Sequence, residues 1–113
     1  LDKLKERYSL HIITNGFRDV QRKKLKNSSL SHYFSTVTDS ESVGVKKPNP
    51  LIFLKALNLA NCLPENSLMI GDDYEADILG AKKVKMNTIL INHHKKLFEC
   101  VQIKRLDELL NYL

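Results

Sequence analysis

The chain has 113 residues, of which 42% are hydrophobic and 27% are charged, as expected for one globular domain with a single core. No apolar run approaches the roughly 20 residues that span a bilayer, and nothing at the start resembles a signal peptide, so we expect no membrane partner and a cytoplasmic location. The net charge of +5 includes a basic cluster over 18–26, but no aromatic residues alternate with these charges to stack on bases, so we interpret it as a solvated helix face and expect no nucleic-acid partner.

Hydrophobic periodicity and turn residues predict alternating helices and strands in the first half of the chain. Asn15-Gly16 marks a turn after the first strand. Pro50 is expected to begin a helix in which only Lys55 and Asn58 are strongly polar; these lie on one face, so we expect the remaining side chains to be buried. The predicted elements are a helix over 2–8, a strand over 10–13, a basic helix to about Lys26, a strand over 35–38 and a helix over 51–60.

The second half continues the alternation. Gly80 and Ala81 are small enough for close packing of a helix on a sheet. Four leucines near the C-terminus have the i, i+3, i+4, i+7 spacing of a helix that lies on a core. The predicted elements are a strand over 67–70, a helix over 74–84, a strand over 87–92, a short strand over 100–103, and a last helix carrying Leu106, Leu109, Leu110 and Leu113.

Strands that alternate with helices predict an α/β fold, with a mostly parallel sheet and helices on both faces. No repeat or linker marks a second domain. In such sheets ligands bind beyond the carboxyl ends of the strands. Three polar segments are expected at that edge, namely Thr14-Asn15-Gly16, Lys46-Lys47-Pro48 and Gly71-Asp72-Asp73.

These segments together suit a magnesium ion beside a phosphoryl group. Four acids occur within six positions from Asp72 to Asp77, and magnesium typically takes one or two carboxylates plus phosphate oxygens. A lysine such as Lys47 neutralises phosphate as a point charge. The Thr14 hydroxyl and the backbone N–H groups of Asn15 and Gly16 can bind the remaining oxygens.

Each of these residues also has a purely structural explanation. Thr14 can simply end a strand, and Lys47 can be an ordinary loop lysine. Asp73 can cap the following helix, with Glu75 and Asp77 favoured near its positive N-terminus. Capping requires neither the spacing of Asp72 and Asp77 nor the lysine and threonine at the same edge, so the combination favours a phosphate site.

The same residues resemble a known family. "HIITNGF", "GVKKPNPLIF" and "MIGDDYEADILGA" are similar to the second, third and fourth motifs of haloacid dehalogenase-like (HAD) hydrolases, in the family's order. The separations, 33 positions from Thr14 to Lys47 and 25 from Lys47 to Asp72, are typical of the family. The resemblance covers nearly the whole chain, and "ITNGF" with "QRKKLKNSSLSHYF" and "GVKKP" is most similar to the branch of nucleotide-directed phosphatases.

The resemblance implies a Rossmann-like core and a magnesium-dependent phosphatase acting on a small phosphorylated metabolite, such as a nucleoside monophosphate, through an aspartyl-phosphate. Thr14 would hydrogen-bond the phosphoryl group, helped by the backbone of Asn15 and Gly16. Lys47 would hold the phosphate. Asp72 would bind magnesium, and Asp77 would complete the metal site or orient Lys47.

One part of the family pattern is missing. The first motif, an Asp-x-Asp that supplies the nucleophile and lies on a strand between those ending at Thr14 and Asp72, does not occur in the chain. We therefore expect residues 1–113 to be the C-terminal portion of an HAD-like core domain, with an incomplete sheet, without its cap domain, and inactive alone. The exposed strands are expected to pair with the protein's own N-terminal part or in a strand-exchanged dimer.

Two non-catalytic alternatives stay open. A receiver-like phosphoacceptor module also sets acids, a hydroxyl and a lysine at a sheet edge, but in the order acids, hydroxyl, lysine, whereas this chain has hydroxyl, lysine, acids. An HAD-like protein that binds phosphate or a partner without turnover is the other.

Cys62 and Cys100 lack metal-ligand spacing and are expected to be small core residues in a reducing compartment. The histidines, His11, His32, His93 and His94, are interpreted as surface or loop residues.

Overall fold

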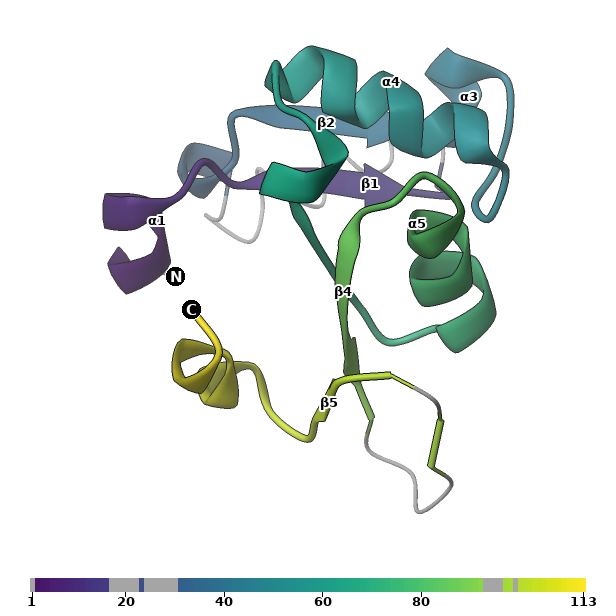
Figure 1. Cartoon of the computed structure of the whole chain (residues 1–113). Coiled ribbons are helices and arrows are strands. Elements are labelled where there is room, and N and C mark those ends of the chain that lie inside the picture. The colour runs from purple at the N-terminus through teal and green to yellow at the C-terminus, as the bar shows by residue number, and fades with distance from the viewer. Residues whose placement is uncertain (1, 17–22, 24–30, 93–96, 99) are drawn as a thin grey trace.

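The computed structural model describes residues 2–16, 23, 31–92, 97–98 and 100–113 (Figure 1). Of the basic helix predicted to about Lys26, all but Lys23 lies outside these residues. In the described part no helix is long and apolar enough to cross a membrane. The elements are α1 (Asp2–Arg7), β1 (His11–Thr14), η1 (Ser31–Tyr33), β2 (Thr36–Asp39), α3 (Ser40–Val43), α4 (Pro50–Ala60), η2 (Pro64–Asn66), β3 (Leu68–Gly71), η3 (Tyr74–Leu79), α5 (Gly80–Lys83), β4 (Asn87–Ile91), β5 (Gln102–Ile103) and η4 (Leu106–Asn111).

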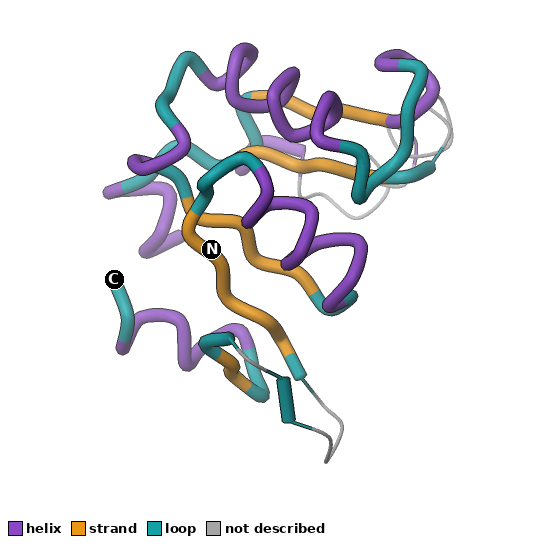
Figure 2. The backbone as a smooth tube through the Cα atoms, turned by 45° about the vertical axis from the view of Figure 1, so that its right-hand side comes forward, coloured by secondary structure: helices purple, strands orange, loops and turns teal. Residues whose placement is uncertain are grey.

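Every strand pair is parallel, which confirms the predicted α/β class. The strands form two separate sheets, β1–β2 and β3–β4–β5 (Figure 2), and among the described residues β1 and β3 are not paired. β1 and β3 begin one residue later than predicted, at His11 and Leu68, and they end at Thr14 and Gly71. The gap between the two sheets thus separates β1, which ends at Thr14, from β3, which ends directly before Asp72.

Helices cover both faces of the β3–β4–β5 sheet, as predicted. Successive side chains of a strand point to opposite faces. Met69 accordingly packs in a core with α4 and α5, whereas its neighbours Leu68 and Ile70 pack in a second core with η4 and α1. Ile13 of β1 also packs against the first core, so apolar contacts join the two sheets although no strand pairing does.

Helix α4 begins as predicted but is less buried. Pro50 occupies its first turn, where a missing N–H costs nothing, and the Asn49 side chain accepts a hydrogen bond from the backbone N–H of Leu51 at 3.0 Å. One face, including Phe53, is fully buried. The prediction that every residue except Lys55 and Asn58 is buried is wrong, because α4 packs on β1, β2 and α5 along one side only; the exposed leucines are Leu51, Leu54 and Leu59.

The last helix also differs from its prediction. η4 is a 3₁₀-helix with three residues per turn, so the 3.6-residue stripe of leucines does not face the core. Only Leu109 is buried, against Ile89 and Ile103, while Leu106, Leu110 and Leu113 are exposed.

Replacing the adjacent residues Leu109 and Leu110 one at a time tests which of them faces the core. Leu109 is 1% exposed and Leu110 is 46% exposed, so Leu109→Ala is expected to lower the free energy of unfolding by about 2–4 kcal/mol, through lost burial and a cavity, and Leu110→Ala by less than about 1 kcal/mol. Urea denaturation followed by circular dichroism measures both. Equal losses would favour the α-helical stripe instead.

His11 is not the surface or loop residue that was predicted. It is a half-buried residue of β1 whose Nδ1 and Nε2 atoms lie 2.7 Å from the hydroxyls of Thr36 and Ser9. Burial lowers the pKa of the His11 imidazole, because desolvation disfavours its charged form. His32 is exposed as predicted, and His93 and His94 lie outside the described residues. Cys62 and Cys100 are half-buried free thiols rather than core residues.

The lowered pKa of His11 makes stability depend on pH. Below the ordinary histidine pKa of about 6.5 the unfolded chain takes up a proton that the folded state resists, so the unfolding free energy falls as pH is lowered through this range. His11→Gln, which keeps hydrogen-bonding capacity without the charge, should flatten the curve measured by denaturation between pH 7.5 and 5.5. A curve that is as steep in His11→Gln as in the unmodified protein contradicts the assignment.

Candidate active site

The centre of the candidate site is a salt bridge between Lys47 and Asp77. The ammonium nitrogen of Lys47 lies 2.6 Å from Oδ1 of Asp77, and the two side chains are 13% and 6% exposed. Lys47 comes from the loop between α3 and α4, and Asp77 from η3. Two oppositely charged groups this poorly hydrated stabilise each other, since either one alone would be left without a partner.

Local structure around β3 holds Asp77 in place. Its Oδ2 atom accepts a hydrogen bond from the backbone N–H of Asp73 at 3.2 Å, and its own N–H donates to the Asp73 carbonyl at 2.9 Å. Gly71 ends β3 directly against this carboxylate, and a Cβ there would overlap the Asp77 side chain. A glycine is therefore required at this position for Asp77 to reach Lys47, a role that the sequence reasoning missed.

The predicted helix over 74–84 forms as two consecutive pieces. Its first part, η3, is a π-helix, a rare form that is frequent at functional sites, and α5 continues it. The Asp73 carboxylate accepts from the N–H of Ala76 at 2.9 Å, which confirms the capping interpretation of Asp73. Gly80 lies against the Phe53 ring and Pro48, so the close packing expected of Gly80 occurs against α4 and the Lys47 loop.

The end of β1 contacts the lysine loop from the other side. The Asn15 side chain accepts a hydrogen bond from the backbone N–H of Lys47 at 2.7 Å and donates one to the Lys47 carbonyl at 3.2 Å. The sequence reasoning used Asn15 as a turn residue and through its backbone, so it missed this contact. No local pattern indicates it, because the partners are 32 residues apart.

Thr14 ends β1 beside this contact. Its hydroxyl oxygen accepts the N–H of Gly16 at 3.2 Å, and among the described residues the hydroxyl hydrogen has no acceptor, so it is available to donate to a ligand oxygen. The Gly16 carbonyl accepts from the Ser40 hydroxyl at 3.4 Å, which ties the turn to α3. The Gly16 N–H, expected from the sequence to bind phosphate, is engaged within the turn.

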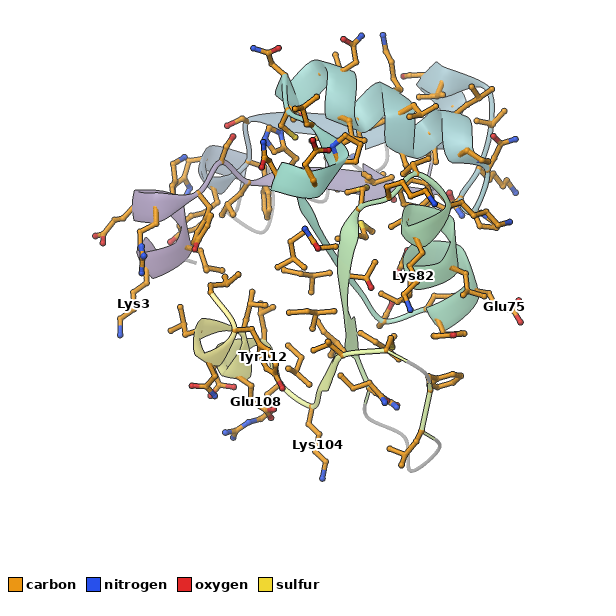
Figure 3. The ribbon with its side chains drawn as sticks, in the orientation of Figure 1. Lys3, Glu75, Lys82, Lys104, Glu108 and Tyr112 are labelled. Carbon is orange, nitrogen blue, oxygen red and sulfur yellow. The ribbon has the colours of Figure 1, made fainter. Side chains whose placement is uncertain are left out.

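Asp72 takes no part in the salt bridge. Its carboxylate is exposed, and within the described residues it makes no hydrogen bond or ion pair. It borders an open hollow of about 450 Å³, whose walls include Tyr74 and Phe98, stacked with ring centroids 4.5 Å apart. Glu75 also borders this hollow and points away from η3 into solvent (Figure 3).

The residues of the site fit a magnesium ion that would be held by one carboxylate of this chain, that of Asp72. Magnesium commonly binds one or two carboxylates and completes its shell with water and phosphate oxygens, and the unpartnered carboxylate of Asp72 provides such an anchor. Both oxygens of Asp77 are engaged by Lys47 and the Asp73 N–H, and no group of three metal-ligating side chains occurs in the described part of the chain. Asp77 as a metal ligand stays a prediction; its contacts orient Lys47.

The chain is similar to known proteins over most of its length. The family described as "Haloacid dehalogenase-like hydrolase" matches residues 1–91. A glyceraldehyde 3-phosphate phosphatase of Methanothermobacter thermautotrophicus is 40% identical over 81% of this chain and 41% of its own length. The pyrimidine 5'-nucleotidase YjjG of Escherichia coli is 40% identical over 85% of this chain and 43% of its own length.

A solved structure is similar over almost the whole fold. The HAD-hydrolase YfnB of Bacillus subtilis, crystallised with magnesium bound, superposes with a TM-score of 0.91 at 31% identity, covering 99% of this chain and 51% of that protein. The chain thus spans about two fifths of the two curated relatives and half of this structure.

Neighbouring lysines provide a test of the salt bridge. Lys47→Met leaves the Asp77 carboxylate without its partner and is expected to lower the free energy of unfolding by about 3 kcal/mol. Lys46→Met removes an exposed ammonium and should change it by less than about 0.5 kcal/mol. Urea denaturation at pH 7 measures both. The double variant Lys47→Met/Asp77→Asn should regain part of the loss; no recovery would mean that the two side chains act independently.

Proposed function

This chain belongs to the haloacid dehalogenase-like hydrolase family, and from that premise we propose that it forms the C-terminal part, residues 1–113, of the core of a magnesium-dependent phosphatase. The observation that carries the proposal is the poorly solvated Lys47–Asp77 pair at the carboxyl edge of two parallel sheets, tied through the Asn15 side chain to the end of β1, the strand that ends at Thr14. This edge is where parallel sheets bind ligands.

Each residue has one role in the proposed reaction. Lys47 holds the phosphoryl oxygens and offsets their charge, and Asp77 orients its ammonium. Thr14 donates its hydroxyl hydrogen to another phosphoryl oxygen. Asp72 is the carboxylate of this chain that would hold magnesium, which when bound neutralises charge on the phosphate oxygens.

The covalent chemistry needs a nucleophile from outside this chain. We propose that an aspartate carboxylate attacks phosphorus, the ester oxygen leaves with a proton from a neighbouring acid, and water then hydrolyses the aspartyl-phosphate. The chain contains no Asp-x-Asp sequence that could supply both groups, so residues 1–113 alone are expected to be inactive. That it spans only about two fifths of its curated relatives supports this division of labour.

The proposed substrates are small phosphate monoesters. One relative is named for glyceraldehyde 3-phosphate and another for pyrimidine 5'-nucleotides, and both names describe a phosphate ester on a small metabolite. The Lys47, Thr14 and Asp72 groups address the phosphate, which all such compounds share. A nucleoside monophosphate and a sugar phosphate are therefore both candidates.

The split sheet supports a strand partner. β1 and β3 present backbone N–H and C=O groups that are not paired with each other in the described residues. We propose that a strand from the protein's own N-terminal part, or from a second copy by exchange, pairs with these edges, because unpaired edges bind added strands.

A phosphate-binding protein without turnover is the second candidate, supported by the missing Asp-x-Asp. In this case the chain holds phosphate between Lys47 and Thr14, and nothing attacks it. The two candidates predict the same ligand and differ only in hydrolysis. A receiver-like module is a third; it predicts that acetyl phosphate labels an aspartate of this chain.

Phosphate release from glyceraldehyde 3-phosphate and uridine monophosphate, with and without magnesium, tests the proposal. The 113-residue chain alone should show no release above background, whereas the longest polypeptide that contains it should release phosphate only with magnesium. In that polypeptide Asp72→Asn should reduce the rate at least about 100-fold, since magnesium is lost. Glu75→Gln, a nearby exposed acid that points away, is the matched control and should stay within about 2-fold.

The outcomes separate the candidates. Magnesium-dependent release by the 113-residue chain, abolished by Asp72→Asn, would overturn the expected inactivity of the chain. Absence of hydrolysis in the longer polypeptide, together with phosphate binding that Lys47→Met removes, would favour the phosphate-binding candidate.

A further inference from the structure

The Asn15 side chain makes two hydrogen bonds to one residue on a distant loop. Its Oδ1 atom accepts the N–H of Lys47 at 2.7 Å, and its Nδ2 atom donates to the Lys47 carbonyl at 3.2 Å. We propose that Asn15 is the positioning residue of the site: its amide sets the backbone of Lys47 and thereby aims the ammonium. The catalytic meaning rests on the proposed function, whereas the positioning of Lys47 stands without it.

The chemistry of the contact is specific to an asparagine. Contact with both a backbone N–H and a backbone C=O requires a short side chain with one acceptor and one donor, which the amide provides. Aspartate has acceptors only and would place a charge against the Lys47 carbonyl. Alanine removes both bonds, and serine is too short to span the two peptide groups.

The contact matters because of what lies at the other end of Lys47. The backbone is fixed by Asn15 and the ammonium by Asp77, so the flexible four-carbon side chain is held at both ends. Asp77 is fixed in turn by the Asp73 N–H and by Gly71 at the end of β3. A cation held in this way does not have to reorient when charge develops on a phosphoryl group.

The same hydrogen bonds connect the two sheets. Asn15 follows β1, and Asp77 belongs to the helix that follows β3, and these strands are not paired with each other in the described residues. A polar chain from Asn15 through Lys47 to Asp77 therefore joins the carboxyl edges of both sheets at the candidate site. Displacement of either edge would move the ammonium.

The role inferred here differs from a ligand contact. Both polar atoms of the Asn15 amide are used by the Lys47 peptide groups, so the side chain is engaged before any substrate binds. Asn15 therefore acts through Lys47, whereas Thr14 keeps a hydroxyl hydrogen for the substrate. Loss of Asn15 should impair the step in which Lys47 offsets charge more than it impairs substrate binding.

Asn87 provides a matched control. Its Nδ2 atom also makes side-chain hydrogen bonds to the backbone, to the Glu65 and Ser67 carbonyls at 3.1 and 3.0 Å, but it lies at the start of β4, at the opposite edge of the sheet. Asn87→Ala removes bonds of the same kind without touching the lysine loop. A general loss of stability would appear in both variants, and a loss of positioning only in Asn15→Ala.

The first test does not depend on activity. The protein is treated with limiting acetic anhydride, and acylation of Lys47 relative to the adjacent exposed Lys46 is quantified by peptide mass spectrometry. Asn15→Ala and Asn15→Asp should raise the ratio several-fold, because the ammonium is held less well against Asp77, and Asn87→Ala should leave it at the wild-type value. An unchanged ratio in both Asn15 variants, or an equal rise in Asn87→Ala, overturns the proposal.

If the Asn15 variants do not fold, hydrogen exchange in the unmodified protein still tests the contact between Asn15 and Lys47. The Lys47 amide donates to Asn15 and should therefore exchange with deuterium more slowly than the amide of exposed Lys46. Exchange of Lys47 at the rate of an unstructured amide would contradict the contact. The measurement needs neither magnesium nor substrate.

A kinetic test addresses the catalytic meaning in the longest polypeptide that contains the chain. Asn15→Ala should lower kcat about 10- to 100-fold with KM changed less than about 3-fold, as expected for a misplaced transition-state contact. Asn87→Ala should keep both constants. A change confined to KM would overturn the positioning role, whereas absence of any wild-type turnover would overturn the proposed function and leave the acylation result standing.

Discussion

The salt bridge between Lys47 and Asp77 is the constraint on which the rest of the site depends. Two charges with little access to water are stable only together, so the loop before α4 and the helix after β3 must meet at 2.6 Å. Several local features follow from this requirement. Gly71 leaves room for the carboxylate, the π-helix η3 carries it, and the Asn15 amide holds the lysine backbone opposite.

The fold places this polar bridge where the sheet is discontinuous. Apolar packing joins the two sheets, because Ile13 of β1 packs against a core formed by α4, β3 and α5. At the carboxyl edge the hydrogen bonds of Asn15, Lys47 and Asp77 make the connection. The edges of β1 and β3 that are not paired with each other belong to the same region as the site, so a strand that filled the gap would lie next to the lysine and the threonine.

In the proposed function the site supplies one half of the groups that phosphoryl transfer needs. A lysine cation and a hydroxyl bind phosphate directly, the carboxylate of Asp72 would do so through magnesium, and none of the three is the proposed nucleophile. The relatives named as phosphatases are more than twice as long as the matching part of this chain. The proposed division, in which residues outside 1–113 supply the attacking carboxylate, accounts for both observations.

The sequence by itself determined the order of the strands, each to within a residue or two, the start of α4 at Pro50 and the three polar segments at one edge, because hydrophobic period, turn residues and motif spacing are local properties of the chain. It did not indicate the short helical elements η1, α3 and η2. Only the tertiary structure decided which atoms meet. Which leucines of α4 are exposed and which single leucine of η4 is buried depends on how much of each side chain its neighbours cover. The contacts of His11 depend on the same packing. The contacts of Lys47 with Asn15 and Asp77 join residues about thirty positions apart, which no local pattern specifies, since the packing of the whole chain brings them together.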